Sequence, residues 1–192
     1  KGFSRATGEI IAWLNSDDLF LPDTLEKVAA LFEQNPDAGI IYGDVLSIDG
    51  DGNPINVQRF APYKLEDLMA FNIISQPGVF MRHSVLEQAG YLNLDYHFLL
   101  DHHLWLRMAQ LAPMVYTPQN LAKARYHANA KNIAHAEKFG QEAFKILDWM
   151  KTQPLLMNIL RKKERQILAG AYHLDAFYLV EAGKMREGLI AY

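Results

Sequence analysis

The chain has 192 residues, half of them apolar and 21% charged, which is the balance of a folded globular protein rather than a disordered one. The formal net charge of -3 provides no broad basic field for a nucleic-acid backbone, so no nucleic-acid partner is expected. The absence of cysteine excludes disulfides, thiolate metal sites and thiol catalysis, and it fits a reducing compartment.

Membrane and targeting signals are also missing from the sequence. No apolar run approaches the length of about 20 residues that a membrane-spanning helix needs, and residues 1–9 lack the apolar stretch of a signal peptide. We therefore expect a cytoplasmic protein, or one held peripherally at the inner face of the membrane. The sequence begins abruptly at Lys1, just before a buried-type strand, so a piece of a longer polypeptide is expected.

The first third of the chain alternates strands with a helix. Residues 9–14, EIIAWL, form a short continuous apolar run that predicts a strand buried on both faces. After the polar residues 15–18, Pro22 predicts a helix start, and Leu25, Val28, Ala29 and Phe32 recur at helical spacing. A second buried strand at 39–45, a turn at 49–53 and a return strand at 55–60 follow. This alternation favours an α/β sheet domain.

The sequence pattern in the middle of the chain predicts smaller elements. A helix at 64–71, a strand at 78–81 and a helix at 84–89, ended by Gly90, come first. A helix at 101–111 and short closing strands at 115–116 and 123–126 follow. The helix at 101–111 is expected to bury Leu104, Trp105, Met108 and Leu111 on one side.

The last third changes character and predicts long helices at about 133–151, 155–181 and 185–192. We place a domain boundary near residue 130, with residues 131–192 as a helical tail. The small and aromatic residues at the end of the tail resemble half of a tetratricopeptide-type helix pair. A plain helical appendage explains them as well, because repeat arrays need several units.

An acidic cluster follows the first predicted strand, where open α/β sheets bind ligands. Asp17 and Asp18 supply the oxygen ligands that Mg²⁺ and Mn²⁺ prefer, usually completed by substrate phosphates. The alternative is a turn with a helix cap, because Asn, Ser and Asp suit that structure too.

The wider string around this cluster resembles a known family. Residues 6–18, ATGEIIAWLNSDD, are similar to the segment of family 2 glycosyltransferases that carries the Asp-X-Asp motif. The resemblance implies that Asp17 contacts the divalent metal, Mn²⁺ or Mg²⁺, that bridges the donor diphosphate. Asn15 stands where a first Asp is commoner, and Asn15 and Asp18 are expected to help to place the donor.

Two further segments resemble the same family. Residues 75–82, SQPGVFMR, are similar to its acceptor-side segment, where Gln76 would contact donor or acceptor and Gly78 would allow close backbone approach. Residues 100–107, LDHHLWLR, resemble the family's Glu-Asp-x-Asp-Leu-Trp-Leu-Arg block, which makes Asp101 the expected general base and Arg107 a donor or acceptor contact. A simple helix cap is the alternative for Asp101.

The third segment departs from the family pattern at two positions. Leu100 replaces the usual Glu and His103 replaces the second Asp, changes that would alter acceptor preference or lower activity. His102 and His103 point to different helix faces, so they are not expected to chelate one ion, and a pair exposed on the surface is the expectation.

A fourth segment, RYH at 125–127, resembles the stretch that ends the catalytic core in many enzymes of the GT-A fold. There His127 would complete the metal site, and a neutral imidazole suits Mn²⁺ better than Mg²⁺. A lone histidine is also explained by a structural or exposed position. The Tyr-Gly-Asp stretch at 42–44 recurs in relatives as well, although Asp44 is explained equally as the end of a strand.

Taken as a whole, the resemblance implies an α/β fold. Residues 1–130 would form a truncated, Rossmann-like GT-A sheet domain, which is the C-terminal part of a nucleotide-diphospho-sugar transferase domain. The helical tail follows it. The implied activity is metal-assisted transfer of a sugar, with inversion, from a nucleotide-sugar donor to a glycan or other hydroxyl acceptor, as in polysaccharide biosynthesis. Nothing corresponds to the family's first strands and helices, so weak nucleotide-sugar binding by this chain alone is expected.

Alternatives from other classes stay open. A metal-dependent phosphohydrolase also uses acids after a strand, but it needs a second set of carboxylates that the sequence does not display. A noncatalytic interaction module is the other reading, with residues 131–192 as a docking surface. Self-association is expected in either case, because a truncated sheet exposes a strand edge.

Overall fold

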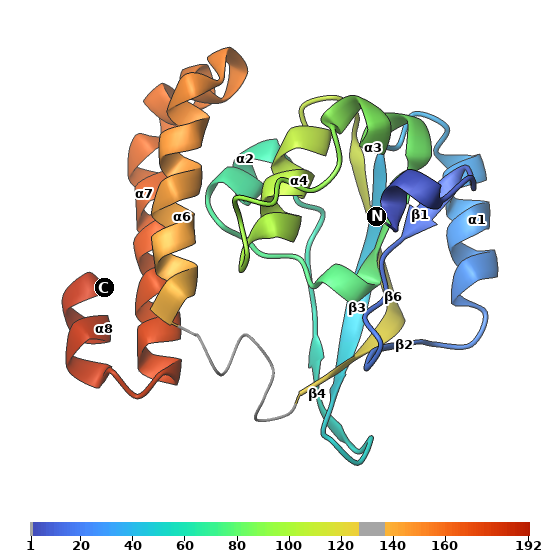
Figure 1. Ribbon diagram of the computed structural model, residues 1–192, viewed down its shortest axis with the longest axis horizontal. Helices are drawn as coiled ribbons and strands as arrows, with labels where there is room; N and C mark the ends of the chain where they lie inside the picture. The colour runs from blue at the N-terminus through green and yellow to red at the C-terminus, as the bar shows by residue number, and fades with distance from the viewer. Residues whose placement is uncertain (1, 127–136) are drawn as a thin grey trace. The chain divides into compact units, whose positions relative to one another are not determined.

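The computed structural model describes residues 2–126 and 137–192 (Figure 1). These residues form two compact units, each described here by itself. The first unit consists of residues 2–64, 74–92 and 104–126, and the second of residues 65–73, 93–103 and 137–192. No helix in the described part of the chain is both long and apolar enough to cross a membrane.

The first unit is built on a six-stranded mixed sheet with the order β1-β5-β3-β6-β2, and β4 pairs with β3 beside this path. Its strands are β1 (Ile10–Ala12), β2 (Leu19–Phe20), β3 (Ile40–Ile48), β4 (Pro54–Gln58), β5 (Val79–Arg82) and β6 (Met114–Arg125). Strands β3 and β6 are parallel, and the other pairs are antiparallel. Because β1 and β3 are both antiparallel to β5, they run in the same direction and end toward the same edge.

Helix α1 (Thr24–Gln34) covers one face of this sheet. Val28 and Phe32, one helical turn apart, pack with Ile41 of β3 and Phe80 of β5. The predicted helix and both strands are thus confirmed, although Leu25, which the sequence placed on the apolar stripe, is 62% exposed.

Short helices frame the sheet elsewhere. A 3-10 turn, η1 (Phe3–Arg5), precedes β1. Helix α3 (His83–Ala89) ends, as expected, at Gly90, whose φ of 82° is the left-handed conformation that glycine adopts without strain.

Strand β6 differs from the prediction of two short strands at 115–116 and 123–126. It is a single strand of 12 residues, paired with β3 from end to end. Its register shifts twice near Asp44 of β3, which accommodates Pro118, a residue that cannot donate to the ladder. Pro118 interrupts the strand pattern of the sequence, and the shifted pairing with β3 lets one strand continue past it.

The second unit contains the long helices of the tail. Helices α6 (Glu137–Thr152) and α7 (Pro154–Glu181) lie side by side, and α8 (Met185–Ala191) folds back on the end of α7 (Figure 1). Their close approach explains Gly140, since a Cβ there would overlap the side chain of Asp175. The predicted helices are confirmed where they are described, while residues 133–136 of the first one lie outside the described residues.

Two earlier segments belong to the second unit as well. They carry α2 (Leu65–Met69) and the first residues of α4 (Leu100–Met108), whose remainder from Leu104 belongs to the first unit. The proposed boundary near residue 130 lies outside the described residues, and the second compact unit adds residues 65–73 and 93–103 to the long helices. As predicted, α4 buries Leu104, Trp105 and Met108, but the helix ends before Leu111, which is 49% exposed.

Candidate functional site

The acidic cluster at 15–18 follows strand β1, as predicted. Nδ2 of the exposed Asn15 donates to Oδ2 of Asp18 at 3.0 Å and to Oε1 of Gln76 at 3.1 Å. An ionised carboxylate only accepts hydrogen bonds, so Asp18 determines which way the amide is turned. The structure thus joins two of the predicted segments and leaves Oδ1 of Asn15 as an acceptor that neither of these bonds uses.

Asp18 is the buried member of the cluster, at 8% exposure. Its Oδ1 accepts the backbone N–H of Arg125 at 2.9 Å, while Oδ2 accepts from Asn15. Burial raises the pKa of the Asp18 carboxyl above its usual value, and these two hydrogen bonds partly offset that rise. Asp18 therefore shapes the loop that presents Asn15 and Asp17.

Arg125 organises this loop, a role that sequence reasoning missed. Its Nε donates to the backbone oxygen of Asp17 at 3.1 Å. One terminal nitrogen donates to the backbone oxygens of Asp49 at 2.9 Å and Gly50 at 2.8 Å. The rigid fork of a guanidinium suits bonding to several backbone carbonyls at once. The signal for this role in the sequence was a basic residue at the end of a predicted strand. His127, the predicted metal ligand, lies outside the described residues.

The donor atoms at 15–17 suit a metal ion that protein and substrate hold together better than an ion that the protein holds by itself. Among the described residues, no three histidine, cysteine or acidic side chains cluster as a metal site. Mg²⁺ is usually bound through one or two carboxylates, with substrate phosphates and water completing the shell. The half-buried Asp17 carboxylate and the amide oxygen of Asn15 match that pattern, with a nucleoside diphosphate supplying further oxygens.

The acceptor-side segment forms a 3-10 turn, η2 (Gln76–Gly78), that leads into β5. Gln76 is buried, and its Nε2 donates to the backbone oxygen of Trp13. A Cβ on Gly78 would lie 2.6 Å from Cγ2 of Val45 and 2.9 Å from the backbone oxygen of Gly43. The close approach expected at Gly78 is therefore made to β3 of the protein itself, and no ligand is needed to explain this glycine.

Asp101 lies in the first turn of α4, where its Oδ1 accepts the backbone N–H of His102 at 2.7 Å. Burial raises the pKa of the Asp101 carboxyl to about 6, and the charge of Glu142 adds to this rise. A base with this pKa is ionised at neutral pH and still accepts a proton readily. Asp17 belongs to the first unit and Asp101 to the second.

Glu142 of α6 is a second residue that sequence reasoning missed. It is buried, and Oε2 accepts the backbone N–H groups of Phe98 at 2.8 Å and Leu99 at 2.7 Å. Oε1 accepts the N–H of His97 at 2.6 Å. A carboxylate is favourable at a helix start, where unpaired N–H groups gather. Glu142 thereby orders the segment that leads to Asp101, and nothing local in the sequence pairs these positions.

The expectation of an exposed histidine pair is wrong, because His102 and His103 are both buried. Nε2 of His102 lies 3.0 Å from the backbone oxygen of Leu68, and burial lowers the pKa of His102 to about 4, so its ring is neutral. His103 stacks on Tyr96 and contacts the edge of Trp149. These aromatic partners lie elsewhere in the chain, and only folding brings them to the histidines.

Arg107 uses its guanidinium inside the first unit. Its two terminal nitrogens donate to the backbone oxygens of Ala89 and Tyr91, on either side of the Gly90 turn that ends α3. These carbonyls are among those that a helix end leaves without partners. The arrangement favours a structural role for Arg107 over the substrate contact inferred from the sequence.

A mixed α/β sheet with an acid cluster directly after strand β1 places this chain in the GT-A class of folds. PcManGT, a mannosyltransferase from Pyrobaculum calidifontis solved in complex with GDP-Man and Mn²⁺, shares this fold. The two chains superpose with a TM-score of 0.58 at 17% sequence identity, and the match covers 99% of this chain and 52% of the PcManGT chain.

Sequence comparison points in the same direction. Residues 1–90 match the model of glycosyl transferase family 2. The amylovoran biosynthesis glycosyltransferase AmsE of Erwinia amylovora is 27% identical over 138 residues, covering 68% of this chain and 50% of AmsE. A PGL/p-HBAD biosynthesis glycosyltransferase of Mycobacterium tuberculosis is 29% identical over 102 residues, covering 53% of this chain and 38% of its own. The chain thus spans half or less of these relatives.

Proposed function

We propose that this chain serves in the transfer of a sugar from a nucleotide-diphosphate donor to an acceptor hydroxyl, with inversion and with the help of Mn²⁺ or Mg²⁺. The observation that carries the proposal is the hydrogen bond from Asn15 to Gln76, which joins the acid cluster to the acceptor-side segment. The match of residues 1–90 to the model of glycosyl transferase family 2 supports the reaction class. The GDP-Man and Mn²⁺ bound to PcManGT support the donor class.

On the donor side, Asp17 and Oδ1 of Asn15 would hold the divalent ion together with the donor diphosphate, and His127 would add a nitrogen ligand. The ion, when bound, neutralises charge that develops on the leaving diphosphate. Asp18 assists donor placement through the loop, because its carboxylate fixes both Asn15 and the backbone of Arg125.

On the acceptor side, Asp101 would take the proton of the acceptor hydroxyl. The acceptor oxygen then forms its bond to the anomeric carbon while the bond from that carbon to the diphosphate oxygen breaks, and the electron pair leaves with the diphosphate. Because burial raises the pKa of Asp101 to about 6, transfer should fall as pH drops below about 6, where the base becomes protonated.

A polysaccharide or other glycan is the proposed acceptor class, in line with the amylovoran biosynthesis named for AmsE. We also propose a cytoplasmic or peripheral membrane location and self-association through an exposed sheet edge, since β1 stands at one end of the sheet order.

Paramagnetic broadening by Mn²⁺ in the presence of GDP or UDP tests the donor site in the full chain. We expect the amide resonances of residues 15–18 to broaden selectively, even at the weak affinity expected for this chain. Asp17→Asn should reduce the broadening at least tenfold, while Asp37→Asn, an exposed acid on the loop after α1, should leave it unchanged. Equal broadening in Asp17→Asn and the parent chain would rule out this metal site.

A further inference from the structure

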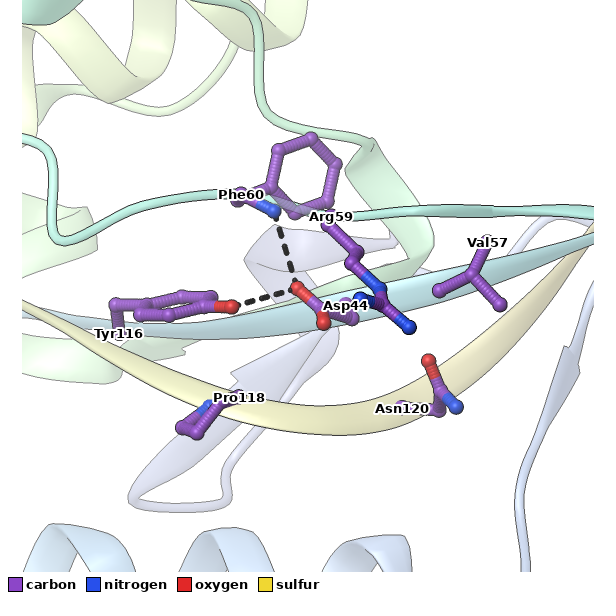
Figure 2. Close-up of a pocket in the computed structure, with 7 residues that line it drawn as sticks. All are labelled: Asp44, Val57, Arg59, Phe60, Tyr116, Pro118 and Asn120. Carbon is purple, nitrogen blue, oxygen red and sulfur yellow. Dashed lines mark hydrogen bonds between the residues drawn. The ribbon is translucent and has the colours of Figure 1, made fainter.

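An open pocket of about 490 Å³ lies in the first unit, apart from the acid cluster (Figure 2). Strands β3 and β6 and the segment around the end of β4 form it. Its lining residues are Asp44, Val57, Arg59, Phe60, Tyr116, Pro118 and Asn120. None of them belongs to the predicted site, so the pocket has no role in the mechanism above.

Asp44 is the polar centre of the pocket and is only 6% exposed. Its Oδ1 accepts the hydroxyl of Tyr116 at 2.8 Å and the backbone N–H of Phe60 at 3.1 Å. Oδ2 accepts no hydrogen bond from the described residues, and in Figure 2 it lies on the side away from Phe60. A buried carboxylate oxygen in this state is a strong acceptor for a ligand hydroxyl.

Arg59 and Asn120 add donors to the same space. Both side chains are exposed, and neither forms a hydrogen bond or ion pair within the described part of the chain. Asn120 stands opposite Asp44 in the β3–β6 pairing, at the point where the register shifts. Bulges of this kind redirect side chains, and they are common beside functional sites.

Val57, Phe60 and Pro118 add apolar surface to the polar lining of the pocket. Phe60 and Pro118 lie on opposite sides of Asp44 in Figure 2, and Val57 closes a third side. A sugar ring offers a matching surface, because its C–H faces pack on apolar groups while its hydroxyls both donate and accept. The carboxylate of Asp44 and the guanidinium of Arg59 balance in charge, so the pocket has no net attraction for a charged ligand. Their acceptor and donor atoms suit a polyhydroxylated ring.

The pocket is close to the candidate donor site along the sheet. Gly43, next to Asp44, contacts Gly78, and Gln76 of the same turn bonds to Asn15. Strands β3 and β1 are separated by β5 alone, which corresponds to about 10 Å at two strand spacings. We propose that this pocket binds a neutral sugar ring of the glycan acceptor. The role as an acceptor site rests on the proposed glycosyl transfer. The binding of a sugar in the pocket does not depend on that proposal.

Saturation-transfer NMR on the full chain tests the pocket. The probes are the methyl α-glycosides of glucose, galactose and mannose, with glucuronate and glucosamine as charged comparisons. We expect transfer to at least one neutral glycoside and a loss of at least fivefold in Arg59→Gln and Asp44→Asn. Arg161→Gln, an exposed arginine on α7, is the matched control and should bind as the parent chain does.

The outcomes separate this proposal from the proposed function. No transfer to any neutral glycoside, equal transfer in Arg59→Gln, or stronger transfer to glucuronate would overturn the pocket assignment. Asp17→Asn should keep glycoside binding, and Arg59→Gln should keep the Mn²⁺ broadening. Loss of the metal response with glycoside binding retained therefore counts against the donor site alone.

Discussion

Oε2 of Glu142 lies 2.7 Å from the backbone nitrogen of Leu99, two residues before Asp101. Glu142 comes from helix α6 of the tail, and its charge contributes to the raised pKa of Asp101 after the larger effect of burial. The tail helix therefore shares a compact unit with the proposed base and orders the segment that carries it. In the proposed mechanism, the tail therefore helps to position the base.

Replacing Glu142 by Ala should destabilise the chain by about 2–4 kcal/mol, because three backbone N–H groups lose their acceptor in a buried place. Glu142→Gln keeps one acceptor oxygen and should cost less. Urea unfolding followed by circular dichroism measures both. The exposed Glu164→Ala on α7 is the control and should change stability by less than about 0.5 kcal/mol. Equal stability of the Glu142→Ala and Glu164→Ala variants would show that the three bonds contribute nothing.

Replacing Asp101 by Asn should stabilise the chain at pH 8. The pKa of this carboxyl is about 6 in the folded chain and about 3.9 in an unfolded one, so folding favours the protonated form. The stability contributed by that form is complete below pH about 4 and is lost as pH rises through about 6.

Because Asn imitates the protonated acid at every pH, Asp101→Asn should gain about 1–3 kcal/mol over the parent chain at pH 8 and almost nothing at pH 4. Denaturant unfolding at the two pH values measures the difference. Asp37→Asn, which removes an exposed charge, should show no such pH dependence. A gain of the same size at both pH values would contradict the raised pKa.

Asp18→Ala should cost about 1–3 kcal/mol of stability, since the N–H of Arg125 and the amide of Asn15 both lose a charged acceptor. Thermal or urea unfolding of this variant, compared with Asp37→Ala, gives the value. Hydrogen exchange at the amide of Arg125 should also accelerate, which locates the effect. Unchanged exchange there would remove Asp18 from the role of holding the loop.

Gly78→Ala should destabilise the first unit by about 1–3 kcal/mol, because the added Cβ would lie 2.6 Å from Cγ2 of Val45 and 2.9 Å from the Gly43 carbonyl. Gly50→Ala is the comparison, since a Cβ at Gly50 meets nothing within 4 Å. The two variants are compared by urea unfolding. A neutral effect at Gly78 would restore the reading that this glycine leaves room for substrate.

Local patterns in the sequence were sufficient for most elements of the fold. Val28 and Phe32 at helical spacing predicted α1, and the apolar run before the acids predicted β1. These signals are short-range, because helical and strand periodicities place side chains on a face without reference to distant residues. The single strand β6 was missed, since Pro118 breaks the local pattern and only the pairing with β3 restores continuity.

In the candidate site, too, local sequence patterns predicted some residues and missed others. Asp17, Asp18, Gln76 and Asp101 were singled out from their own segments, and only the structure shows the bond from Asn15 to Gln76 that joins two of these segments. Glu142 carries no local signal, and the position of Arg125 at the end of a predicted strand did not reveal its partners, because the partners of both residues lie far along the chain. The burial of His102 was missed for the same reason, since Leu68, its hydrogen-bond partner, lies 34 positions away.

The sequence by itself determined the α/β class, the match of residues 1–90 to a family model and the residue types offered for chemistry. The tertiary structure alone decided which groups Asp18, Gly78 and Arg107 contact within the protein, and which groups surround Asp101. The physical reason is that hydrogen bonding, close packing and desolvation act between residues that are neighbours in space. Periodicity and motif spacing report only on neighbours along the chain.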